Sequence, residues 1–138
     1  LQPLTENGWL CGFGLVFPAS REPLILVIDD NEHTVELVSR YLAANGYKAL
    51  HAFTAEEGVR LARENQPEAI ILDLMMPNQD GWDVLQTLTN HAKTQRIPIM
   101  VCSILAAGEL ALSLGATLFL EKPITERALI AALKSLRL

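Results

Sequence analysis

Short apolar runs alternate with helical patterns along most of the chain, and this alternation constrains the fold more than any other feature. Five runs have the length of buried strands, at residues 24–28, 48–53, 69–72, 97–102 and 117–120. Apolar residues recur at helical spacing after each run, and turn residues such as Asn45-Gly46 and Gly115 close the helices. Strands separated by helices in this way predict an α/β fold, with a doubly wound parallel sheet between two layers of helices.

The composition bounds the function before any motif is considered. At 138 residues, half of them hydrophobic and a fifth charged, the chain suits one globular domain. A net charge of -5 without a cluster of Lys and Arg argues against nucleic-acid binding by this segment. No stretch reaches the roughly 20 apolar residues of a membrane span. Cys11 and Cys102 form no disulfide framework, which suits a reducing, cytoplasmic compartment.

Residues 1–22 differ from the rest, and we expect them to be an extension or linker ahead of a domain at 23–138. The segment from Pro18 to Pro23 is typical of a linker. The apolar stretch at 9–17 carries two glycines and no preceding basic region, so it does not resemble a signal peptide. It is either a strand of an upstream domain or an added edge strand. The first residue is Leu rather than Met, which suggests a piece of a longer protein.

Polar side chains stand at the carboxyl ends of four predicted strands, where sites lie in doubly wound folds. They are Asp29 and Asp30 after the first strand, Asp73 after the third, Ser103 after the fourth and Lys122 after the fifth. Singly, each has an ordinary explanation: an aspartate at a helix start or turn, a serine cap, a solvated lysine. These explanations do not account for the placement of all five residues at one edge of the sheet.

Three clustered carboxylates form a hard-oxygen site that suits Mg²⁺. Without a metal they would repel one another, because a single lysine does not balance them. A cation held by few protein ligands leaves room for phosphate oxygens, and a neighbouring carboxylate can attack phosphorus to form an acyl phosphate. Lys122 and Ser103 can then bind the phosphoryl oxygens.

With these residues the chain resembles the receiver domain of two-component response regulators. The segments that carry the resemblance are VIDDNE, ILDLMMPNQDG, VCS and FLEKP, which fall in the family's order between Leu24 and Leu138. It implies a flavodoxin-like (βα)₅ fold with strand order 2-1-3-4-5. It also implies a phosphorelay role: a sensor histidine kinase or a histidine phosphotransfer protein supplies a phosphoryl group, and the domain, which is not an enzyme, controls a linked or separate output domain. A homodimer is left open.

The resemblance implies a role for each residue of the site. Asp73 accepts the phosphoryl group and, with Asp30 directly and Asp29 largely through water, binds Mg²⁺. The backbone carbonyl of Met75 completes the metal ligands. Ser103 is the switch hydroxyl, Lys122 the phosphate partner and Phe119 the switch aromatic, and the bond between Lys122 and Pro123 is expected to be cis.

The segment after the fourth strand departs from the family pattern. Ile104 stands where a small residue is common, and only 19 positions separate Ser103 from Lys122, a few fewer than usual. We expect a shortened helix there and expect the stiff Ile104 to crowd the path of Phe119, which would weaken the usual switch.

Two other classes of function compete with a phosphorylated switch. One is a Mg²⁺-dependent phosphohydrolase with an aspartyl nucleophile; such enzymes tend to carry a second acid two residues after the nucleophile, where this chain has Met75. The other is a receiver-shaped interaction module that is never phosphorylated. The full set of acids, serine and lysine argues against that alternative.

Overall fold

The computed structural model describes residues 5–6, 8–9, 22–104 and 106–138. Cys11, Leu105 and most of the predicted linker lie outside these residues. Two short strands, β1 (Thr5–Glu6) and β2 (Gly8–Trp9), pair antiparallel within residues 1–22. No helix in the described part of the chain is long and apolar enough to cross a membrane.

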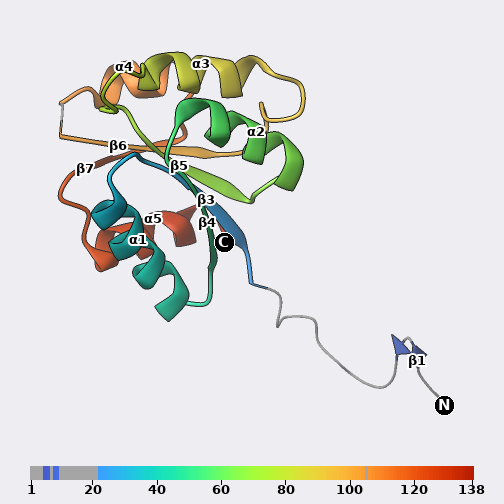
Figure 1. Ribbon diagram of the computed structural model, residues 1–138. Coiled ribbons are helices and arrows are strands. Elements are labelled where there is room, and N and C mark those ends of the chain that lie inside the picture. Colours follow the sequence, from blue (N-terminus) through green and yellow to red (C-terminus); the bar gives the residue numbers. More distant parts are fainter. Residues whose placement is uncertain (1–4, 7, 10–21, 105) are drawn as a thin grey trace.

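A parallel sheet of five strands forms the centre of the domain (Figure 1). Its strands are β3 (Leu24–Ile28), β4 (Lys48–Ala52), β5 (Ala69–Asp73), β6 (Ile99–Ser103) and β7 (Leu118–Glu121). They lie in the order β4-β3-β5-β6-β7, which is 2-1-3-4-5 when counted from β3. The predicted fold is therefore confirmed, and the observed strand ends differ from the predicted ones by at most two residues.

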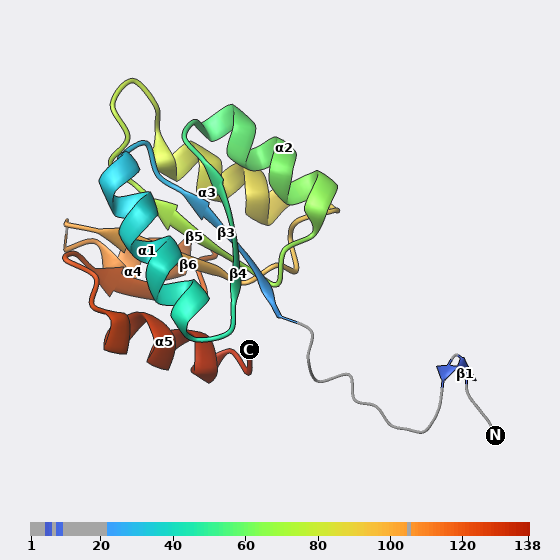
Figure 2. The same ribbon diagram turned by 60° about the horizontal axis from the view of Figure 1, so that its bottom comes forward.

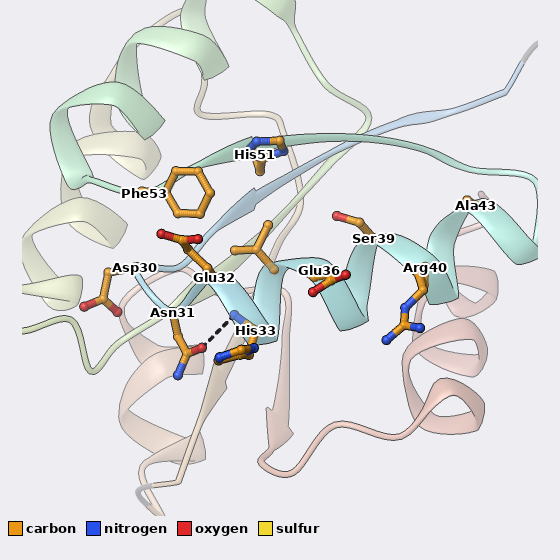
Figure 3. A pocket seen from close by; sticks show the side chains of 11 residues that line it. Asp30, Asn31, Glu32, His33, Glu36, Ser39, Arg40, Ala43, His51 and Phe53 are labelled. Atoms are coloured by element: carbon orange, nitrogen blue, oxygen red, sulfur yellow. Dashed lines mark hydrogen bonds between the residues drawn. The ribbon is translucent and has the colours of Figure 1, made fainter.

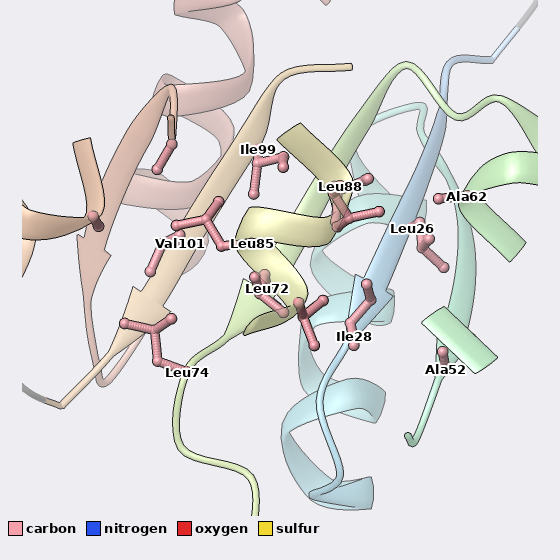
Figure 4. Packing of buried hydrophobic residues seen from close by; sticks show 14 of the residues in the cluster. Leu26, Ile28, Ala52, Ala62, Leu72, Leu74, Leu85, Leu88, Ile99 and Val101 are labelled. Carbon is pink, nitrogen blue, oxygen red and sulfur yellow. The ribbon is translucent and has the colours of Figure 1, made fainter. Parts of the chain in front are cut away.

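Helices cover both faces of the sheet (Figures 1 and 2). They are α1 (Glu32–Ala44), α2 (Ala55–Asn65), α3 (Gly81–Asn90), α4 (Gly108–Ser113) and α5 (Glu126–Ser135). α1 and α5 pack on one face, against alternate strand residues such as Ile25 and Val27. α2, α3 and α4 pack on the other face, against Leu26 and Ile28 (Figure 4). Because burial on both faces requires apolar residues at every strand position, β3 and β5 lack polar side chains until their carboxyl ends.

Side-chain caps define where the helices begin. Asn31, Thr54, Asp80 and Thr125 each accept a hydrogen bond from a backbone N–H of the following turn. The segment TAEE (54–57) predicts a capping box with Thr54 as the cap, and the Thr54 hydroxyl does accept from the N–H of Glu57. Glu57, however, accepts from the N–H of Phe53, one residue before the position that a capping box uses. The helix that follows β6 has only six residues, as the short spacing to Lys122 predicts.

Candidate functional site

The acidic residues expected at the carboxyl edge of the sheet do lie together. Asp29 follows β3 directly and Asp73 is the last residue of β5, and both are almost fully buried, at 3% and 4% exposed. Asp30 is half-buried beside them. One carboxylate oxygen from each of the three lies within 4.8 Å of the others. This is an oxygen-only donor set, which hard cations such as Mg²⁺ prefer.

A lysine from the edge strand enters this cluster. Lys122 follows β7, and its Nζ lies 3.0 Å from Asp29 Oδ2 and 3.4 Å from Asp73 Oδ1. Its backbone N–H donates to the carbonyl of Ser103 at 2.9 Å, which fixes the lysine at the end of the neighbouring strand. The peptide bond between Lys122 and Pro123 is cis. Ser103 is fully buried at the last position of β6.

The two buried aspartates share a local geometry that orients their oxygens. The N–H of Asn31 donates to Asp29 Oδ1 at 2.9 Å, and the N–H of Met75 donates to Asp73 Oδ1 at 3.1 Å. These are Asx turns, in which a carboxylate accepts from the backbone two residues on. On Asp73 the contacts from Met75 and Lys122 both fall on Oδ1. Oδ2 is thus the oxygen that is left for a metal ion or a phosphorus atom.

The charges of the cluster act on one another. Burial raises the pKa of Asp73 above its usual range and the negative charge of Asp29 adds to this, while Lys122 and the Met75 N–H offset only part of it. Burial opposes the charge on Lys122, but Asp29 and then Asp73 outweigh it, so the pKa of the lysine is raised. Ionisation of Asp73 is therefore disfavoured in this cluster, and a divalent cation would favour it by offsetting the negative charge.

The start of α3 is pressed against the backbone that follows Asp73. A Cβ atom on Gly81 would lie 2.5 Å from the Cα of Leu74 and 2.9 Å from the carbonyl oxygen of Asp73. Leu74 and Met76 are buried in the core, whereas Met75 between them is 48% exposed. The loop after the strand is therefore anchored on both sides of Met75, whose side chain faces outward.

A pocket of about 570 Å³ opens above the acidic cluster. Besides the acids and Lys122 it is lined by Met75, Pro77 and Ile104, and by Asn31 and Thr34 from the start of α1. Sequence reasoning missed Asn31 and Thr34, although their place in the first turn after Asp30 could have indicated them. Ile104 is 66% exposed and belongs to this rim.

Phe119 lies elsewhere, and Ile104 does not line the same pocket as its ring. The ring lines a separate pocket under α4, with Gly108 and Glu121. A Cβ atom on Gly108 would lie 3.3 Å from the ring carbon Cδ2, so the first residue of α4 sits directly against Phe119. The Ile104 side chain instead lines the acidic pocket and faces solvent.

A larger pocket of about 920 Å³ lies between α1 and β4 (Figure 3). It shares Asp30 and Asn31 with the pocket above the acidic cluster, so the two are neighbours. The rings of His51 and Phe53 meet edge to face above it, with centroids 5.1 Å apart. Sequence patterns gave no sign of it, because its walls come from α1 and the end of the following strand β4, and no pattern shows how these two elements dock.

The comparison with known protein families decides the identity of this arrangement. Residues 25–134 match the response regulator receiver domain. The chain belongs to the receiver domain family. Response regulator PleD of Caulobacter vibrioides is 36% identical over 115 residues, which cover 81% of this chain and 25% of PleD. The DNA-binding dual master transcriptional regulator RpaA of Synechocystis is 34% identical over 119 residues, covering 83% of this chain and 48% of RpaA.

Solved structures agree with this assignment of the receiver domain. The receiver domain of Francisella response regulator 1452 superimposes with a TM-score of 0.77 at 27% identity, covering 83% of this chain and 96% of that one. The chemotaxis response regulator CheY4 of Vibrio cholerae has the same fold, with a TM-score of 0.77 at 24% identity over 84% of this chain and 99% of that one. This receiver domain spans a quarter to a half of the curated relatives named above.

Membership of the family indicates the general function. Receiver domains act in two-component signalling with histidine kinases and are generally not classed as enzymes. The cluster of Asp29, Asp30 and Asp73 has the composition of the receiver Mg²⁺ site. Its donor set fits the ion, because one carboxylate oxygen from each of the three residues lies within 4.8 Å of the others.

Proposed function

We propose that this receiver domain accepts a phosphoryl group on Asp73 from the phosphohistidine of a sensor kinase or of a histidine phosphotransfer protein. The observation that carries the proposal is the position of Asp73 inside the cluster: its Oδ1 is held by Met75 and Lys122 while its Oδ2 is left for attack. A nucleophilic carboxylate that is oriented by fixed donors needs little reorganisation in the reaction.

The chemistry balances without any further reactant. Asp73 Oδ2 forms a bond to phosphorus as the bond from phosphorus to the donor's imidazole nitrogen breaks, and that nitrogen keeps the electron pair and takes up a proton. Asp30, Asp29, Asp73 and the carbonyl of Met75 would hold Mg²⁺, which would supply positive charge to offset that of the phosphoryl oxygens. Lys122 and Ser103 would then bind oxygens of the phosphorylated Asp73.

The remaining assignments follow from the same proposal. Residues 23–138 constitute the receiver domain and 1–22 an extension or linker. The domain works in the cytoplasm, where its kinase supplies the phosphoryl group, and Phe119 takes part in passing the change to an output domain. The side chain of Met75, two residues after the acceptor, cannot act as the general acid of a phosphohydrolase, which favours a lasting adduct over turnover.

Incubation with a small phosphodonor and Mg²⁺, followed by intact-mass measurement, tests this function. We expect one phosphoryl adduct with the hydrolytic lability of an acyl phosphate, which forms only with Mg²⁺ and disappears in Asp73→Asn. Asp83→Asn, which changes an exposed carboxylate in the first turn of α3, is the matched control and should be phosphorylated normally. Phosphate release without an adduct would indicate a phosphohydrolase. No reaction at all would indicate a module that is not phosphorylated, and an adduct that survives in Asp73→Asn would reject Asp73.

A further inference from the structure

The loop between β5 and α3 is closed by a tight turn that lies next to the proposed metal ligand Met75. The N–H of Gln79 donates to the carbonyl of Met76 at 3.1 Å, with Pro77 and Asn78 between them. Asn78 has a φ of 61°, as the third position of a type II turn requires. The turn therefore has a defined shape, and its last residue is Gln79.

The side chain of Gln79 leaves this loop and reaches a different element. Its Oε1 accepts a hydrogen bond from the N–H of Ala55, the first residue of α2. That N–H is one of the four at a helix start that find no partner inside the helix. Thr54 caps the N–H of Glu57, so a glutamine from another loop completes the cap of α2.

α2 packs closely against β3, the strand that Asp29 directly follows. A Cβ atom on Gly58 would lie 2.7 Å from Cδ1 of Ile28, the residue directly before Asp29. Ala62, one turn further along, is fully buried against the same face of the sheet. The hydrogen bond of Gln79 thus links the loop that follows Asp73 to α2, a helix that packs against β3, the strand that ends directly before Asp29.

We propose that Gln79 is a positioning residue for the metal site, which it serves by holding the turn that sets the Met75 carbonyl relative to the three carboxylates. This inference rests on the proposed function. The exposed side chain of Met75 does not hold this residue in place, so its backbone is positioned by its N–H bond to Asp73 Oδ1, by its buried neighbours Leu74 and Met76, and by the turn. The carbonyl between the strand end and the turn therefore depends on how firmly the turn is held.

Isothermal titration of the full chain with MgCl₂ tests the proposal. Gln79→Met keeps the length of the side chain and removes the acceptor oxygen. We expect Mg²⁺ to bind on the order of threefold to tenfold more weakly, a smaller loss than removing a group that hydrogen-bonds directly to a metal ligand causes. Gln79→Glu keeps an acceptor and should bind Mg²⁺ at least as tightly as the unmodified chain.

The matched control is Gln66→Met at the other end of α2. Gln66 Nε2 donates to the carbonyls of Ala62 and Arg63, so this variant also removes a glutamine side-chain bond from the same helix. A melting curve in EDTA should show that both Met variants lose stability, while Gln66→Met keeps its affinity for Mg²⁺. Equal affinities in Gln79→Met and the unmodified chain would overturn the role of Gln79 alone. An unmodified chain that binds no Mg²⁺ would overturn the metal site and this inference with it.

Discussion

Lys122 Nζ lies 3.0 Å from Asp29 Oδ2, and this ion pair joins residues 93 positions apart in the sequence. The distance from the same ammonium to Asp73 is longer, at 3.4 Å. The lysine is therefore bonded mainly to Asp29, a proposed metal ligand, rather than to the proposed acceptor Asp73. Binding of Mg²⁺ by Asp29 would weaken this pair and release Lys122 toward a phosphoryl group on Asp73.

Replacing Lys122 should have opposite effects on metal binding and on stability. Lys122→Met removes the cation that competes with Mg²⁺ for the carboxylates, so we expect affinity for Mg²⁺ to rise about threefold or more. It also leaves two buried carboxylates without a cationic partner, so the metal-free domain should lose on the order of 1–3 kcal/mol. Titration calorimetry and urea unfolding in EDTA measure the two effects. Lys134→Met, at an exposed lysine of α5, should change neither; weaker Mg²⁺ binding in Lys122→Met would contradict the competition.

The raised pKa of Asp73 predicts how the stability of the metal-free domain depends on pH. Because the folded state favours the protonated carboxyl, its penalty for ionisation is absent below the ordinary pKa of 3.8 and complete above the raised pKa of the folded state. Asp73→Asn should therefore be more stable than the unmodified domain at neutral pH in EDTA, and the difference should vanish as the pH falls below 3.8. Urea midpoints measured across this range check the sign. A variant that is less stable at neutral pH would show that Lys122 outweighs burial.

Removing the Asp30 carboxylate should distinguish the effect of charge repulsion on stability from the effect of Mg²⁺ binding. Asp30 is half-buried, and its carboxylate lies close to those of Asp29 and Asp73. Removing it should lessen the repulsion among them, so Asp30→Ala should melt at a higher temperature in EDTA. It should also lose most of the rise in melting temperature that Mg²⁺ causes, since a ligand stabilises only through its native site. Glu36→Ala, at an exposed residue of α1, is the control. An unchanged response to Mg²⁺ in Asp30→Ala would reject Asp30 as a ligand.

The short α4 predicts a small or displaced response to activation. We expect beryllofluoride, a phosphoryl mimic, to change amide exchange only slightly over 106–113. Gly108→Ala should alter that change because its methyl group would press on Phe119, whereas Ile104→Ala should leave it as it is. Exchange measured by mass spectrometry with and without the mimic decides this. A large protection of α4 together with burial of Phe119 would show that the switch usual in this family operates here.

The lifetime of the phosphorylated state should be long. Met75 lines the pocket above Asp73 and offers no good donor or acceptor for an attacking water. Leu105, which lies outside the described residues, is equally apolar. Replacing Met75 with Asn and Leu105 with Glu should speed phosphate loss on the order of tenfold, about 1.4 kcal/mol of barrier. Phosphate loss followed by intact mass tests this; a half-life of seconds in the unmodified domain, or no acceleration in the double variant, would contradict it.

The sequence was enough to place Asp29, Asp73 and Lys122 on one rim, because parallel strands bring their carboxyl ends to the same edge whatever the details of packing. It could not show that Lys122 lies nearer to Asp29 than to Asp73, because a difference this small depends on the exact conformation of the loops. The bond from Gln79 to α2 was also hidden: it spans 24 positions and requires the turn and the helix to be docked already. The direction of Ile104 depends on the backbone after β6, which no periodic pattern describes.

The order of the strands in the sheet also bears on how the domain is made on the ribosome. β3 and β5 are central neighbours and emerge early, so Asp29 and Asp73 can come together in a nascent chain that has not yet released Lys122. The edge strand β7 arrives last, and it brings the lysine along with α5, whose Leu129 and Leu133 fill the core beneath α1. A chain interrupted before β7 would thus carry an uncompensated acidic pair and an open apolar face, the features that direct incomplete proteins to chaperones and proteases.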